Sequence, residues 1–122
     1  MNIRESAEDY LETILMLCKQ HGSARSVDIA VHLNVSKPSV SFAMKKLREN
    51  GYILMGDDNR ITLTETGESI ARRVLEKHDL LCQMLMRLGV SESTARADAC
   101  KMEHDLSDET FEAIRKHLIL HP

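Results

Sequence analysis

Leu33-Asn34-Val35-Ser36 is the stretch that decides the fold, a tight turn between two short segments with apolar stripes. Asn34 is typical of a helix end, and Ser36 is typical of the residue just before a helix. Pro38 fits the first helical turn, where backbone N–H groups lack a partner within the helix. Apolar residues recur at helical spacing on both sides of the turn, at Val27, Ile29, Ala30 and Leu33, and at Val40, Met44 and Leu47. The sequence therefore predicts a helix-turn-helix, closed at Gly51.

A helix is predicted before this motif and a hairpin after it. The segment Glu8–Leu17 has a helical pattern, with Ser6 as its expected N-cap and Gly22 as its stop. Residues 52–55 and 60–63 are β-prone runs that flank the turn sequence Gly56-Asp57-Asp58-Asn59. This order of elements predicts a winged helix-turn-helix.

The rest of the chain is predicted to be helical. Thr64 begins a long helix that ends at Gly89, Ser91 is expected to cap a fifth helix, and Ser107 a sixth. The predicted fold class is therefore mainly α. A winged helix-turn-helix domain occupies residues 1–64, and an all-helical domain occupies residues 65–122.

The charge of the third helix differs in sign from that of the chain. The formal net charge of the 122 residues is −3, yet residues 36–50 hold four basic side chains and one acidic one. A local basic face is what contact with DNA phosphates requires. The alternative is an ordinary solvated helix face, but the turn and the hairpin favour DNA binding. The candidate DNA-binding residues are Ser36, Lys37, Pro38, Ser39, Ser41, Phe42, Lys45, Lys46 and Arg60. Phe42 could touch a thymine methyl group or pack internally.

A set of metal donors lies in the fifth predicted helix. Cys100, Glu103 and His104 are spaced i, i+3 and i+4, so they would share one helix face. A thiolate, a carboxylate and an imidazole together suit a divalent transition metal. Asp9 and Glu12 form a second pair at i, i+3, for which a solvated helix face is an equally good interpretation. His78 could equally be a polar position on the long helix.

The other cysteines and histidines are predicted to have no such role. Cys18 and Cys82 lie in apolar stripes and are expected in the core, whereas His21, His32, His117 and His121 are expected on the surface. Three widely spaced cysteines do not describe a disulfide framework. No apolar signal region or membrane-length stretch is present, so we expect a cytoplasmic protein that does not bind membranes.

In combination, five sequence marks resemble the diphtheria-toxin-repressor and manganese-transport-regulator family. The resemblance covers almost the whole chain, and its marks are residues 8–12, 35–41, 63–67, 77–81 and 100–107. The resemblance implies a divalent-metal-activated transcriptional repressor of metal-uptake genes. It also implies a homodimer formed by the C-terminal helices, which binds pseudo-palindromic double-stranded operator DNA and takes no small organic substrate.

The same resemblance implies a set of metal ligands, namely Asp9, Glu12, His78, Cys100, Glu103 and His104. Asp9 and Glu12 follow the manganese-type members of the family, whereas Cys100 follows the iron-type members. Thiolate favours Fe²⁺ and softer metals, and carboxylates suit Mn²⁺. We therefore expect Fe²⁺ or Mn²⁺, with one or two ions per subunit, and leave the choice of metal and the operator sequence open.

The sequence is also compatible with two other classes of function. One is a metal-independent winged-helix regulator that senses oxidation through its cysteines. The other is a small metallohydrolase with Glu103 as general base, but no Gly-rich loop or obvious substrate pocket can be found in the sequence. We therefore expect the protein not to be an enzyme.

Overall fold

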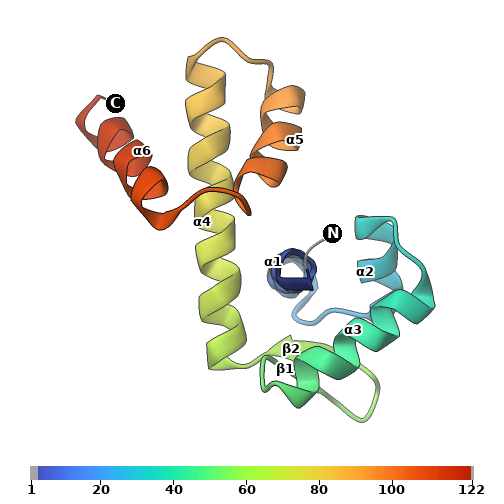
Figure 1. Ribbon diagram of the computed structural model, residues 1–122. Coiled ribbons are helices and arrows are strands. Elements are labelled where there is room, and N and C mark those ends of the chain that lie inside the picture. Colours follow the sequence, from blue (N-terminus) through green and yellow to red (C-terminus); the bar gives the residue numbers. More distant parts are fainter. Residues whose placement is uncertain (1–2, 122) are drawn as a thin grey trace. The chain divides into compact units, whose positions relative to one another are not determined.

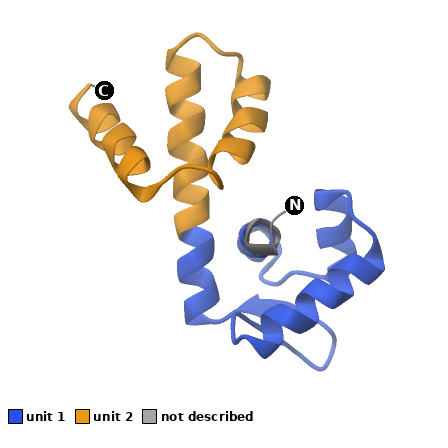
Figure 2. Cartoon of the chain, viewed as in Figure 1, with its two compact units in different colours: residues 1–72 blue, residues 73–122 orange. Residues whose placement is uncertain are grey.

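Six helices and a two-stranded hairpin make up the part of the chain that the computed structural model describes, residues 3–121, with side chains from residue 7 onward. Figure 1 labels these elements along the chain. Two compact units can be distinguished, residues 1–72 (unit 1) and residues 73–122 (unit 2), coloured separately in Figure 2. The predicted domain boundary after residue 64 stays a prediction.

Unit 1 contains three complete helices, the hairpin and the first turns of a fourth helix. Helix α1 spans Ile3–His21, α2 spans Ser26–Leu33 and α3 spans Lys37–Glu49. Helix α1 packs on α2, α3 and β2. The fully buried side chains of this core come from every one of these elements and include Leu11, Ile14, Ile29, Val40, Met44, Ile53 and Ile61. The mainly helical winged helix-turn-helix fold predicted from the sequence is confirmed.

The turn between α2 and α3 has the predicted local structure. Asn34 adopts a left-handed conformation with φ of 54°, and its backbone N–H donates to the last turn of α2. The Ser36 side chain accepts a hydrogen bond of 3.2 Å from the backbone N–H of Ser39. Pro38 occupies the first turn of α3. Short-range interactions therefore fix this turn.

Replacing Ser36 by Ala is expected to lower the free energy of unfolding by about 0.5–2 kcal/mol, because the Ser39 N–H loses its acceptor. Urea denaturation followed by circular dichroism measures this change. Ser41→Ala is the control, since Ser41 lies inside α3 and does not cap it. Equal stability of the two variants would show that the Ser36 cap contributes nothing.

The hairpin forms with the predicted antiparallel pairing. Strand β1 spans Ile53–Met55 and β2 spans Ile61–Leu63, with Leu54 opposite Thr62. The second strand also pairs with the loop before α2. The backbone of Ala24 donates to the Ile61 carbonyl at 2.9 Å and accepts from the Ile61 N–H at 2.8 Å. The hairpin is therefore fastened to the helices of unit 1.

One predicted N-cap in unit 1 is wrong. Helix α1 begins at Ile3, so Ser6 lies within the helix instead of before it. The sequence holds no Gly or Pro between residues 3 and 21, so nothing stops the helix from extending upstream. The predicted stop at Gly22 is confirmed, since Gly22 has a φ of 82° directly after the last helical residue.

Helix α4 spans Glu65–Arg87, so its first eight residues belong to unit 1 and the rest to unit 2. Unit 2 also contains α5, which spans Glu92–Met102, and α6, which spans Asp108–Leu120. Helices α4 and α5 pack through the buried cluster of unit 2, which consists of Leu81, Cys82, Ala95 and Ala99. No helix among residues 3–121 is both long enough and apolar enough to cross a lipid bilayer.

Of the two serine caps predicted in unit 2, one forms its side-chain hydrogen bond and the other does not. Ser107 accepts a hydrogen bond of 3.2 Å from the Thr110 N–H, so its predicted cap of α6 is confirmed. Ser91 occupies the N-cap position of α5 in extended conformation, but its side chain makes no capping hydrogen bond. The Ser91 carbonyl still accepts the first backbone bond of α5, from Ala95 at 2.8 Å. The predicted start of α5 is therefore right, although the side-chain cap is absent.

Candidate functional site

Helix α5 ends earlier than the sequence pattern suggested. Its last residue is Met102, Glu103 is the C-cap, and His104 lies in the turn that follows. The prediction that all three donors share one helix face is therefore wrong for His104. The chain must reverse between α5 and α6, and Ser107 already begins the next helix. Cys100 and Glu103 keep their spacing because Glu103 still has helical backbone angles and donates its N–H to Ala99 at 3.0 Å.

Unit 2 brings three of the predicted ligands together around Glu103. Nδ1 of His78, on α4, lies 3.2 Å from Oε2 of Glu103. Nε2 of His104 lies 3.5 Å from the other carboxylate oxygen, Oε1. The side chain of Glu103 is fully buried, and those of the two histidines are 15% and 5% exposed. Donor atoms bound to one ion lie about 3 Å apart, because each sits about 2.1 Å from the metal. The cluster therefore has the spacing of a metal half-site.

Glu103 has an unusual environment for a carboxylate. Both of its oxygens are buried, and neither accepts a hydrogen bond from any residue that the structure describes. A buried charge without hydrogen bonds is costly, so it requires a nearby cation to compensate it. The donor types around it are imidazole and carboxylate, which divalent transition metals accept. The residues therefore fit a bound metal ion.

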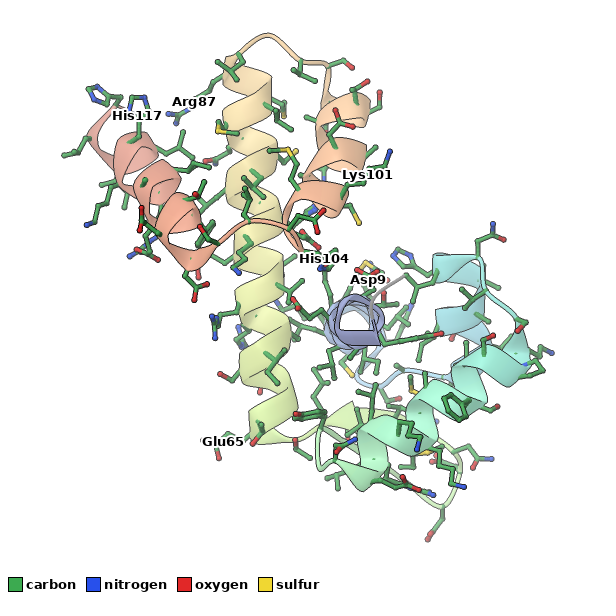
Figure 3. All side chains as sticks on the ribbon, in the orientation of Figure 1. Asp9, Glu65, Arg87, Lys101, His104 and His117 are labelled. Atoms are coloured by element: carbon green, nitrogen blue, oxygen red, sulfur yellow. The ribbon has the colours of Figure 1, made fainter. Side chains whose placement is uncertain are left out.

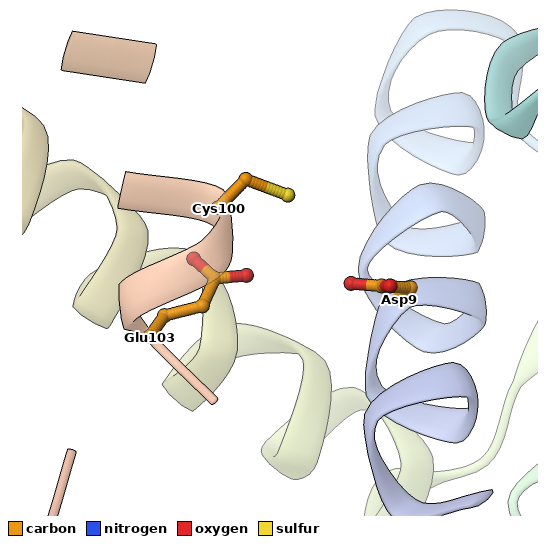
Figure 4. A group of neighbouring side chains, drawn as sticks. All are labelled: Asp9, Cys100 and Glu103. Carbon is orange, nitrogen blue, oxygen red and sulfur yellow. The ribbon is translucent and has the colours of Figure 1, made fainter. Parts of the chain in front are cut away.

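The three cysteines have different environments. Cys100 is exposed and lies one helical turn before Glu103, as Figure 4 shows. Cys82 is buried, which confirms its predicted place in the core. Cys18 is partly buried, and its thiol donates to the Ile61 carbonyl at 3.7 Å. Burial, and then the negative charge of Glu68, raise the pKa of the Cys18 thiol. A thiol with a raised pKa is a weak nucleophile and a weak ligand at neutral pH.

Unit 1 holds the other two predicted ligands. Asp9 and Glu12 are partly buried side chains on α1, one helical turn apart. Figure 3 labels Asp9 on this helix. Because i, i+3 neighbours lie on the same helix face, the two carboxylates can act as a pair. Their combination with the donors of unit 2 stays a prediction.

The nine predicted DNA-binding residues all belong to unit 1 and are all exposed. Phe42 is 65% exposed, so internal packing of its ring is excluded. The Lys46 ammonium lies 5.6 Å from the centre of the Phe42 ring, within the range of a cation–π contact. Arg60 forms an ion pair of 2.9 Å with Asp58 on the hairpin. Helix α3 therefore presents an accessible basic face.

Lys77 has a role that the sequence pattern did not reveal. It precedes His78 on α4, and its ammonium lies 3.7 Å from Asp108 in the first turn of α6. The same ammonium lies 5.6 Å from the centre of the Phe111 ring. These contacts tie the start of α6 to α4 and so anchor one end of the turn that carries Glu103 and His104. Only the tertiary structure pairs Lys77 with Asp108, and no local signal indicates it.

Two family models together match nearly the whole chain. The model described as "Iron dependent repressor, N-terminal DNA binding domain" matches residues 2–58. The model described as "Iron dependent repressor, metal binding and dimerisation domain" matches residues 64–119. The transcriptional regulator MntR of Escherichia coli is 42% identical over 112 residues, covering 92% of this chain and 72% of the relative. The chain belongs to the iron-dependent repressor family. It is a metal-dependent, DNA-binding transcriptional repressor of the diphtheria-toxin-repressor and manganese-transport-regulator type.

Further relatives and solved structures agree with this assignment. An uncharacterised helix-turn-helix-type transcriptional regulator of Methanocaldococcus jannaschii is 38% identical and covers 91% of this chain and 90% of its own length. Among solved structures, IdeR of T. acidophilum aligns with a TM-score of 0.83 at 28% identity, covering 91% of this chain. The manganese regulator SloR aligns with a TM-score of 0.82 at 31% identity, covering 92%. The chain spans only 53% of each of these two solved chains.

Proposed function

We propose that the protein represses transcription when Mn²⁺ or Fe²⁺ binds at Glu103 and the donors around it. The observation that carries this proposal is the buried Glu103 carboxylate, whose oxygens accept no hydrogen bond from the described residues and face two imidazoles. The family is made up of metal-dependent transcriptional regulators, which favours this function over an oxidation sensor and over an enzyme.

The proposed ligands come from both units. Unit 2 supplies His78, Cys100, Glu103 and His104, and unit 1 supplies Asp9 and Glu12. Carboxylate, imidazole and thiolate donors together suit a divalent transition metal. One or two ions per subunit are compatible with this set. When bound, the ion supplies the positive charge that lets these carboxylates lie together.

The choice between Mn²⁺ and Fe²⁺ depends on Cys100. Carboxylates and imidazoles can hold either ion, but a thiolate favours the softer Fe²⁺. Because Cys100 is exposed, it is accessible to an ion and to solvent. Replacing it by Asp would therefore shift the preference toward Mn²⁺.

The chain's own residues link the proposed metal site to DNA. Asp9 and Glu12 are on α1, which packs on the DNA-reading helix α3, so ligands and reader belong to one unit. His78 is on α4, the helix that leads from the hairpin into unit 2. A metal held by both units would favour one arrangement of the two reader helices in a homodimer. Metal and DNA would then both bind this arrangement more tightly than other arrangements. Metal binding would therefore strengthen DNA binding, and DNA would strengthen metal binding in return.

The partners follow from the same proposal. A homodimer formed through the unit 2 helices would place one α3 in each of two successive major grooves of a pseudo-palindromic operator. No membrane or small organic substrate is involved, and the protein acts in the cytoplasm.

A DNA-binding titration tests this function directly. Labelled duplex DNA is first selected from a random pool with the protein and Mn²⁺, and its affinity is then measured anaerobically with Mn²⁺, with Fe²⁺ and with a chelator. We expect tight binding with either metal and weak binding with the chelator. Equal affinity in all three conditions would contradict metal-dependent repression.

Replacing Lys46 by Gln is expected to weaken DNA binding and to lower the slope of log affinity against log salt by about one. The physical reason is the loss of one phosphate contact from the exposed face of α3. Fluorescence anisotropy at several salt concentrations measures the slope. Lys19→Gln is the control, because Lys19 is an exposed lysine on α1 outside the predicted face. Identical slopes for the two variants would remove Lys46 from the interface.

A further inference from the structure

The C-terminal end of α6 carries two imidazoles on one face. His117 and His121 are four residues apart, both are exposed, and their ring centres lie 4.5 Å apart with an angle of 39° between the planes. His121 is the C-cap of α6, with φ of −127° and ψ of 66°, so it lies just beyond the last helical residue, and its ring still lies beside that of His117. Figure 3 labels His117 at this end of α6. The spacing is that of the histidine pair that chelates zinc in the His-Glu-x-x-His motif.

The backbone of this pair is held by two hydrogen bonds. The His121 N–H donates to the His117 carbonyl at 2.9 Å and closes the last helical turn. Arg87, on α4, donates from Nη1 to the His121 carbonyl at 2.8 Å. The end of α6 is therefore fastened to α4 within unit 2. Fixing the backbone lowers the entropy that two ligands would lose when they bind one ion.

The electrostatic surroundings allow the two histidines to bind a cation with moderate affinity. The partial negative charge at the C-terminal end of α6 favours a cation. Two basic side chains oppose it, namely Arg87, which is bound to the His121 carbonyl, and the exposed Lys116. Neutral imidazoles do not need a carboxylate nearby to bind late transition metals.

We propose that His117 and His121 form a second, surface metal site that takes Ni²⁺, Cu²⁺ or Zn²⁺. Imidazole suits these ions, and the affinity of a nitrogen site rises from Mn²⁺ through Fe²⁺ to Ni²⁺ and Cu²⁺. The site therefore selects against the two proposed activators. It shares no residue with the cluster around Glu103 and does not depend on the function proposed for that cluster.

Calorimetric titration of the full-length, metal-free protein with Ni²⁺ tests the proposal. We expect the wild type to bind Ni²⁺ at one more site than His117→Gln or His121→Gln. Removing a residue that only orients a metal ligand weakens metal affinity about 10–100-fold. Removing one of the two ligands themselves should therefore lower the Ni²⁺ affinity of this site at least about tenfold. Isotherms of wild type and both variants that superimpose would overturn the proposal.

His21→Gln is the matched control. His21 is also exposed and also ends a helix, but Leu17 occupies the position four residues before it. We expect this variant to bind Ni²⁺ as the wild type does, and an equal loss in all three variants would overturn the proposal. Glu103→Gln separates this inference from the proposed function, because it should remove binding at the Glu103 cluster and leave the His117–His121 site intact.

Discussion

Replacing Glu103 by Gln is expected to abolish the response of DNA binding to Mn²⁺ and Fe²⁺ without unfolding the protein. The carboxylate lies 3.2 Å from one imidazole nitrogen and 3.5 Å from another, so it is central to the proposed ligand set. Gln has nearly the same shape but carries no charge. The variant therefore removes the electrostatic attraction for the ion and leaves the packing of unit 2 in place.

Thermal unfolding gives a second readout of the same variant. A ligand that binds only the folded state stabilises that state by about 2.7 kcal/mol when the ligand concentration is a hundred times the dissociation constant. Saturating Mn²⁺ should raise the melting temperature of the wild type accordingly and leave that of Glu103→Gln nearly unchanged. Metal-free Glu103→Gln should be at least as stable as the metal-free wild type, because it buries no uncompensated charge.

Glu76→Gln is the control for both measurements. Glu76 is an exposed glutamate on α4, two residues before His78 and outside the ligand set. Its variant should keep the metal-dependent rise in melting temperature and the metal-dependent affinity for DNA. A rise of wild-type size in Glu103→Gln would show that the ion binds elsewhere, and the proposed metal centre would then be wrong.

The turn between α2 and α3 shows which parts of the fold can be predicted from the sequence. Asn34 and Ser36 act on backbone groups only a few residues away, so their effects depend little on the rest of the structure. The hairpin was predictable for the same reason, since its turn residues lie between two β-prone runs. Where a short-range interaction specifies the conformation, the residue types alone are sufficient.

His104 shows where this kind of prediction fails. The i, i+4 spacing places it beside Cys100 only if the helix continues, and α5 ends at Met102. The end is set by the reversal of the chain into α6, which depends on the tertiary contacts of unit 2. His104 nevertheless lies against Glu103, from a turn instead of a helix. The sequence thus identified the cluster of His78, Glu103 and His104 through the family resemblance, while its geometry required the structure.

The burial of Glu103 could not be predicted either. A glutamate at the end of a short helix is ordinarily solvated, and nothing in the neighbouring residues indicates that both of its oxygens are enclosed. The pairing of Lys77 with Asp108 is likewise a contact between residues distant in sequence. Long-range contacts of this kind determine which of the candidate donors lie close enough together to form a site.

Replacing Gly67 by Ala is expected to destabilise the protein by about 3 kcal/mol, the upper end of the usual cost of overpacking. In the first turns of a helix such as α4, this substitution would ordinarily stabilise, since Ala has the higher helix propensity. Here an added Cβ would overlap the backbone carbonyl of Tyr52. A backbone group cannot move aside as a flexible side chain can, so the contact reverses the usual sign.

The surroundings of Gly67 make relaxation costly. The Tyr52 carbonyl accepts a hydrogen bond of 3.1 Å from the Thr64 N–H. The Thr64 hydroxyl donates to the Gly51 carbonyl at 2.7 Å and accepts from the Gly67 N–H at 3.1 Å. Any shift that admits a methyl group must therefore break part of the network that joins the end of α3 and the hairpin to the start of α4.

Urea denaturation of Gly67→Ala and of the control Ser69→Ala measures the effect. Ser69 is exposed on the same turn of α4, so its variant introduces the same residue without the overlap. We expect Ser69→Ala to equal or slightly exceed the wild type in stability and Gly67→Ala to fall well below it. If both variants were as stable as the wild type, the close approach of α4 to Tyr52 would be incorrect. The first turn of α4 would then be held less tightly against the end of α3 and the hairpin.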